Sequence, residues 1–167
     1  MSEQISRHRI RLLMVIMMAG LIVSGITAFP LHAELQLLDQ WLAANNFHNR
    51  FCLWIHRVTI GLTDVHDNYP FIAYGTDWLA FAHFVIAIAF LGPYRDPVKN
   101  SWVIDWGIIA CIMVIPMALV AGPLRGIPFF HQLIDCLFGV TAFTLLFTCR
   151  RLISAIKFSA YSTHKNP

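Results

Sequence analysis

Four long runs of apolar residues dominate the pattern of hydrophobic and polar positions. They cover residues 12–29, 71–91, 108–122 and 127–149. A helix needs about 20 apolar residues to cross a bilayer. The pattern therefore predicts an all-α integral membrane four-helix bundle, with spans at about 10–30, 70–92, 101–122 and 128–150 in a single membrane domain, 1–167.

The stretch 31–69, between the first two spans, has a different periodicity. Its apolar residues recur at helical spacing in two sets: Leu31, Leu35, Leu38 and Leu42, then Phe51, Trp54, Ile55, Val58 and Leu62. AANNFHN separates the two sets and TDVHDNYP follows them, and both are rich in turn-forming residues. We expect two short amphipathic helices that cover the bundle or lie in the membrane interface, with turns at both polar stretches.

The composition and the distribution of charge agree with a membrane protein. Hydrophobic residues make up 57% of the chain and charged residues 13%, about half the charged share of soluble domains. Across four spans, nine of the twelve Lys and Arg residues fall on the side of the termini. The positive-inside rule then predicts a multi-pass membrane protein with both termini in the cytoplasm and 31–69 outside. The net charge of +3 does not indicate nucleic-acid binding.

Small residues recur four positions apart on two of the predicted spans. The first carries Gly20, Ser24 and Ala28, and the third carries Gly107 with Cys111 and Ala118 with Gly122. Such stripes let neighbouring membrane helices approach closely. We expect both to be helix-packing surfaces.

Ionisable residues interrupt the apolar runs near the predicted outer face. At a rise of about 1.5 Å per residue, Asp77 and Asp135 each lie roughly 10 Å inside their spans. Glu34 follows the first span and Arg125 lies in the outer loop between the third and fourth. Because a guanidinium can hold carboxylates, these four residues could form a structural network. They could equally line an outward-facing pocket for a small molecule, an ion or a lipid headgroup.

His83 and Asp105 form a second candidate site, for a proton or a cofactor. His83 lies roughly 20 Å down its span and about 120° around the helix from Asp77. Asp105 enters the third span from the inner end at a comparable depth, so a hydrogen bond between them is conceivable. Haem would need a second axial ligand, for which Met113 or Met117 is available. A quinone would need only a histidine or an acid beside an apolar slot.

The sequence contains no standard motif that would indicate a particular catalytic activity or metal site. The chain has no G-x-S-x-G, H-E-x-x-H, P-loop or G-x-G-x-x-G motif, and its four cysteines form no C-x-x-C pair. The spacing of the outer histidines fits no standard metal site, so none is predicted. Asp77 and Asp135 could act as an acid–base pair in a membrane enzyme, so enzymatic activity stays open.

Three runs, SGITAFPL (24–31), YPFIAYGTDWLAFAHFVIA (69–87) and VIPMALVAGPLRGIPFFHQLIDC (114–136), carry a resemblance. Together they resemble a group of small bacterial four-span inner-membrane proteins to which no function is assigned. The resemblance covers about two thirds of the chain. It implies a bacterial inner-membrane location and four spans, and it implies no activity or cofactor.

The leading functional hypothesis is a small non-enzymatic membrane protein whose polar pocket makes it a binding or accessory subunit. The alternatives are a redox component that uses haem or quinone at His83, and a membrane enzyme that uses Asp77 and Asp135. The expected partners are the lipid bilayer and other membrane subunits or further copies of the chain, with no nucleic acid.

Overall fold

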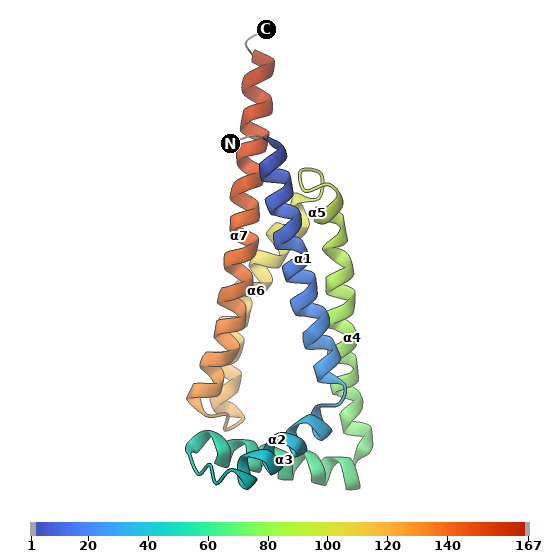
Figure 1. Ribbon diagram of the computed structural model, residues 1–167, viewed down its shortest axis with the longest axis vertical. Helices are drawn as coiled ribbons and strands as arrows, with labels where there is room; N and C mark the ends of the chain where they lie inside the picture. Colours follow the sequence, from blue (N-terminus) through green and yellow to red (C-terminus); the bar gives the residue numbers. More distant parts are fainter. Residues whose placement is uncertain (1–2, 166–167) are drawn as a thin grey trace. The chain divides into compact units, whose positions relative to one another are not determined.

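The computed structural model describes residues 3–165, and every regular element within them is a helix (Figure 1). The elements are α1 (Glu3–Ala28), α2 (Leu31–Ala44), α3 (Arg50–Asn68), the 3₁₀ helix η1 (Pro70–Ala73), α4 (Tyr74–Ala89), α5 (Leu91–Arg95), α6 (Ser101–Leu124) and α7 (Phe129–Lys165). The predicted all-α fold class, with a helical segment between the first and second spans, is confirmed.

Four helical stretches are long and apolar enough to cross a membrane. They are Glu3–Ala28, Pro70–Arg95, Ser101–Leu124 and Phe129–Ser159. Only 17–22% of the most apolar part of each is buried within the protein, so most of its apolar side chains face outward, as lipid contact requires. The chain is thus a multi-pass membrane protein.

Two of these stretches extend beyond the predicted boundaries. The first begins at Glu3 rather than near residue 10, and an ion pair of 2.8 Å between Arg7 Nε and Glu3 Oε1 lies in its first turns. The last continues past residue 150, because α7 has 37 residues. At about 1.5 Å per residue, α7 is longer than the roughly 30 Å of a hydrocarbon core. Charged side chains end an apolar run, but they do not end a helix.

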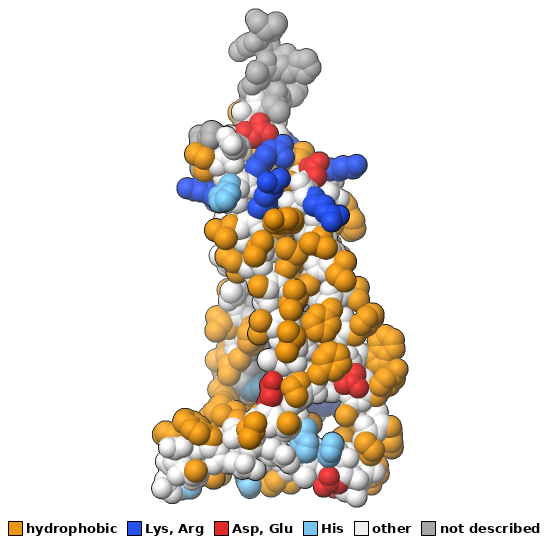
Figure 2. Space-filling model, turned by 45° about the vertical axis from the view of Figure 1, so that its right-hand side comes forward, with side chains coloured by type: hydrophobic (Ala, Val, Ile, Leu, Met, Phe, Trp, Pro, Cys, Tyr) orange, Lys and Arg blue, Asp and Glu red, His pale blue; other side chains and the backbone are white. Residues whose placement is uncertain are grey.

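Contacts divide the chain into two compact units, here called unit 1 (Met1–Ala19 with Ala87–Pro167) and unit 2 (Gly20–Ile86). In unit 1, Lys and Arg side chains gather at one end (Figure 2). The single membrane domain stays a prediction.

In unit 1, α6 and α7 pack against each other along their length. Gly107 permits this approach, since a Cβ there would stand 2.7 Å from Leu146 Cδ1. Gly139 on α7 does the same, because its Cβ would lie 3.1 Å from the carbonyl oxygen of Cys111. Gly107, Cys111 and Gly122 are buried, which confirms the packing surface predicted on the third span.

The turn between α6 and α7 is a Schellman motif. The Ile127 N–H donates to the Gly122 carbonyl and the Gly126 N–H to the Pro123 carbonyl, at 3.0 and 3.1 Å. Gly126 takes the positive φ of 68° that this motif needs. Two carbonyls at the end of α6 are thereby satisfied, and α7 starts five residues after α6 ends.

In unit 2, α2 and α3 form the predicted pair of amphipathic helices. Leu42, Cys52 and Ile55 are the buried core between them, with Leu35 and Leu38 packed against it. The turn falls in AANNFHN as predicted. It ends where the Asn49 side chain accepts a hydrogen bond of 3.0 Å from the Cys52 N–H and so caps α3.

The second predicted turn, TDVHDNYP, is wrong over most of its length. Residues 63–68 continue α3, which ends at Asn68. Within this stretch the Asn68 amide donates to the Asp64 carboxylate at 2.8 Å, one helical turn away. The chain leaves the α-helix only at Tyr69, the residue before Pro70, where proline disfavours the α conformation.

The packing surface predicted on the first span is wrong in its register. A Cβ on Gly20 would meet no atom of the described chain within 4 Å. The close approach in unit 2 uses Gly25, whose Cβ would lie 3.1 Å from both the Ala80 carbonyl oxygen and the Phe84 ring. The Phe29 and Phe84 rings stack nearby, with centroids 6.2 Å apart.

Candidate functional site

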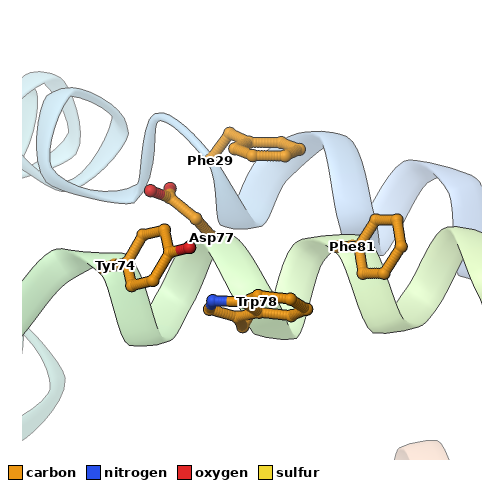
Figure 3. A pocket seen from close by; sticks show the side chains of 5 residues that line it. All are labelled: Phe29, Tyr74, Asp77, Trp78 and Phe81. Atoms are coloured by element: carbon orange, nitrogen blue, oxygen red, sulfur yellow. The ribbon is translucent and has the colours of Figure 1, made fainter.

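Unit 2 contains a pocket of about 230 Å³ beside α4 (Figure 3). It is lined by Phe29, Tyr74, Asp77, Trp78 and Phe81. Phe29 belongs to the two-residue connection between α1 and α2, and the other four belong to α4. The surface of the pocket is thus almost wholly apolar and is formed mainly by four aromatic rings, with the Asp77 carboxylate at its rim (Figure 3).

The α4 residues line the pocket because of their spacing. Tyr74, Asp77, Trp78 and Phe81 stand at i, i+3, i+4 and i+7, which places them on one helical face. Trp78 meets Tyr74 and Phe81 edge-to-face, with ring centroids 5.9 and 5.7 Å apart. This geometry suits the quadrupoles of the rings, and it orders the aromatic wall before any ligand arrives.

Asp77 lies in the first turn of α4. A negative charge is favourable there by about 0.3–1 kcal/mol, because the helix dipole is positive at its N-terminus. The side chain is half-buried. Within unit 2 its carboxylate has no hydrogen-bond or ion-pair partner. The carboxylate is thus held at the pocket without a neutralising group in its own unit.

The other three residues of the predicted polar pocket lie on separate elements. Glu34 is exposed in the first turn of α2 and does not line the pocket. Arg125 is the exposed C-cap of α6, and Asp135 lies on α7 with an oxygen 4.0 Å from His131 Nε2. Arg125 and Asp135 belong to unit 1, and their meeting with Asp77 stays a prediction.

His83 is held in a defined orientation on α4. Its Nδ1 lies 2.7 Å from the Leu79 carbonyl oxygen, and a carbonyl can only accept, so Nδ1 carries the proton. In the neutral form of the ring, this hydrogen bond leaves Nε2 as an acceptor or a ligand atom.

Asp105 has a partner that the sequence analysis did not identify. Its carboxylate accepts a hydrogen bond of 2.5 Å from Arg150 Nε, so α6 and α7 are joined by an ion pair. The same two helices make a second contact, in which Lys157 Nζ lies 3.3 Å from Ser101 Oγ. The sequence could have predicted the ion pair between Asp105 and Arg150. Two antiparallel helices joined by a short turn bring the start of α6 beside the end of the fourth apolar run. The link from Asp105 to His83 stays a prediction.

Several histidines of unit 2 pair between α2 and α3. The His56 Nδ1 lies 2.9 Å from the Asp39 carboxylate, and the His32 and His66 rings stack at 4.5 Å. The His32 Nε2 also lies 3.1 Å from the Thr63 hydroxyl. Among residues 3–165, no three His, Cys, Asp or Glu side chains are grouped to hold a metal ion. These pairs connect the two helices of the hairpin.

Asp77 was predicted from the sequence as a pocket residue, whereas the aromatic residues around it were not. The i, i+3, i+4, i+7 pattern of Tyr74, Asp77, Trp78 and Phe81 was present in the sequence. Phe29 could not be found that way, since its position depends on how the end of α1 meets α4. Comparison with protein-family models, curated proteins and solved structures finds no match to this chain.

Proposed function

We propose that this chain is a bacterial inner-membrane protein that binds a small molecule or a lipid headgroup in the Asp77 pocket. It acts as a binding or accessory subunit, with lipids and other membrane subunits or copies of itself as partners. The observation that carries the proposal is one carboxylate, without a partner in its own unit, at the rim of a pocket lined by four aromatic rings.

The energetics favour a bound partner for Asp77. An ionisable group at the centre of a membrane helix costs about 2.5–3.5 kcal/mol on insertion scales, which is an upper bound for Asp77 because this residue lies in the first turn of α4. The helix-dipole contribution of about 0.3–1 kcal/mol offsets part of this cost. A ligand that supplies a donor or a positive charge would offset the remainder. The predicted Arg125 could contribute to the same balance from the outer loop.

The orientation in the membrane belongs to this proposal. Nine of the twelve Lys and Arg residues would lie on the cytoplasmic side with both termini. The α2–α3 hairpin and the start of α4 would then face outward, so that the pocket opens near the outer membrane boundary. The resemblance to small bacterial four-span proteins supports the inner membrane as the location.

Native mass spectrometry of the full chain in a mild detergent tests the proposal. We expect the wild type to carry a bound small molecule or lipid that is lost in Asp77→Asn and weakened in Arg125→Ala. The matched control is Asp67→Asn, an exposed aspartate at the end of α3 in the same unit. The proposal fails if the wild type carries no adduct beyond detergent, or if Asp77→Asn retains it in full.

A redox role at His83 is a second candidate. It is supported by the imidazole geometry, in which the Nδ1–H···O=C bond to Leu79 leaves Nε2 able to bind haem iron or hydrogen-bond a quinone. A reduced-minus-oxidised absorption spectrum of the purified protein, together with a quinone-reduction assay, decides it. Soret, α and β bands that disappear in His83→Ala would establish haem. A flat spectrum with no quinone reduction would exclude the redox role.

A further inference from the structure

We infer that the Asp77 pocket selects an organic ammonium cation, such as a quaternary or substituted amine. This inference rests on the proposed function and specifies the class of ligand. Its basis is the pairing of one carboxylate with an aromatic wall, the combination by which proteins recognise quaternary ammonium groups.

The arrangement of the rings is suited to a cation. Figure 3 shows Phe29 and Trp78 on opposite sides of the pocket, Phe81 toward one end, and Tyr74 with the Asp77 carboxylate toward the other. A cation within about 6 Å of a ring centroid is attracted by the negative face of the ring, and most strongly by tryptophan. A bound ammonium group would therefore contact aromatic surface while remaining close to a full negative charge.

The charge at the rim of the pocket disfavours anionic ligands. Among the described residues, no Lys, Arg or His lines the pocket, so a phosphate or carboxylate ligand would meet only repulsion from Asp77. A neutral polar ligand would find few donors and acceptors, since Tyr74 and Trp78 supply one polar hydrogen each. An apolar ligand would cover the aromatic surface but would leave the Asp77 carboxylate at the rim without a partner.

The size of the pocket sets the scale of the ligand. About 230 Å³ is below the roughly 300–1,000 Å³ of sites for drug-sized molecules. The pocket would therefore hold an ammonium-bearing headgroup or a small free amine rather than a large substrate. Both sources share the same chemistry, and the test below separates them.

The first measurement is binding of radiolabelled choline to the detergent-purified full chain. Tetramethylammonium should displace choline. Dimethylbutanol, which is the uncharged isostere of choline with carbon in place of nitrogen, should not. We expect Asp77→Asn to abolish binding and Trp78→Leu to weaken it about two- to fivefold, as the loss of a cation–π contact with a half-exposed ring implies. Trp102→Leu, which removes an exposed tryptophan at the start of α6, is the matched control and should bind like the wild type.

The second measurement identifies the source of the cation. The protein is placed in nanodiscs of phosphatidylglycerol alone, or mixed with phosphatidylethanolamine or phosphatidylcholine, and bound lipids are counted by native mass spectrometry. Retention of an amine-bearing lipid that depends on Asp77 and Trp78 supports a headgroup ligand. Saturable choline binding without such retention supports a free amine. Phe81→Leu replaces Asp77→Asn if the latter fails to give a folded protein by circular dichroism.

Two results would overturn the inference, and they can be distinguished. If dimethylbutanol competes as well as tetramethylammonium, or the Asp77-dependent adduct is anionic, the ligand class is wrong while the pocket still binds a ligand. If neither choline nor any lipid depends on Asp77 or Trp78, the ligand class and the proposed function fail together.

Discussion

The side chain of Gln132 on α7 lies directly against Gly122 on α6. A Cβ on Gly122 would stand only 2.6 Å from Gln132 Cγ. Gln132 is 4% exposed, and its amide donates a hydrogen bond of 2.8 Å to the Ile127 carbonyl in the turn between the helices. The glutamine therefore connects the end of α6, the Schellman turn and the first turns of α7.

This contact predicts that Gly122→Ala destabilises the protein. The added methyl must displace a buried side chain that is held by a hydrogen bond, and overpacking of this kind costs about 1–3 kcal/mol. We expect a melting temperature about 2–8 °C lower in detergent. The matched control is Gly20→Ala, where the methyl meets nothing and alanine is the better helix former by about 0.5–1 kcal/mol. Equal melting temperatures for the two variants would contradict the packing described for Gln132.

The ion pair between Asp105 and Arg150 predicts a measurable coupling between α6 and α7. The two side chains are 45% and 36% exposed, so we expect a coupling energy of about 0.5–1 kcal/mol, near the upper end for solvated pairs. A double-mutant cycle of Asp105→Asn and Arg150→Gln, measured by chemical unfolding, gives this value. Additive effects would show that the pair contributes no stability.

The core between α2 and α3 predicts a local loss of stability in Ile55→Ala. Ile55 is 7% exposed, and truncating such a residue costs about 2–5 kcal/mol. We expect faster amide hydrogen exchange and faster proteolysis of α2 and α3, with little change in α6 and α7. Leu53→Ala, at a position 67% exposed, is the matched control. Slow exchange in Ile55→Ala would mean that the hairpin is stabilised from elsewhere.

The proposed orientation predicts which introduced cysteines react in whole cells. Gln40→Cys on α2 should react with a membrane-impermeant maleimide, and Lys99→Cys between α5 and α6 should react only after permeabilisation. Both positions are exposed, so access to the reagent is the only difference expected between them. Wild-type protein supplies the background from the native cysteines. The reverse labelling pattern would place the termini outside.

The helices were predictable because their signals are local. Apolar runs of spanning length produced α1, α4, α6 and α7, and the recurrence of leucine at Leu35, Leu38 and Leu42 predicted the packed face of α2. The end of α3 was wrong because Asp and Asn favour turns but are also tolerated in a last helical turn. There, the Asn68 side chain bonds to Asp64.

The packing partners were less predictable because they depend on rotation about each helix. Small residues recur so often on α1 that the sequence does not distinguish Gly20 from Gly25 as the site of close helix packing. Only the contact with α4 shows that this site is Gly25. The number of residues from the end of the span predicted the depth of Asp77. Its grouping with the charged residues of other elements stays a prediction. Its nearest described neighbours are rings of its own helical face, with Phe29 from the preceding connection.

The connection between α1 and α2 consists of Phe29 and Pro30 alone. Such a short connection, which includes a proline with fixed φ, has little freedom to change its backbone conformation. A ligand that displaced the Phe29 backbone, rather than only rotating its ring, would therefore also move the start of α2, and with it α3 through the core they share. The position of the α2–α3 hairpin would then depend on the backbone at the pocket wall.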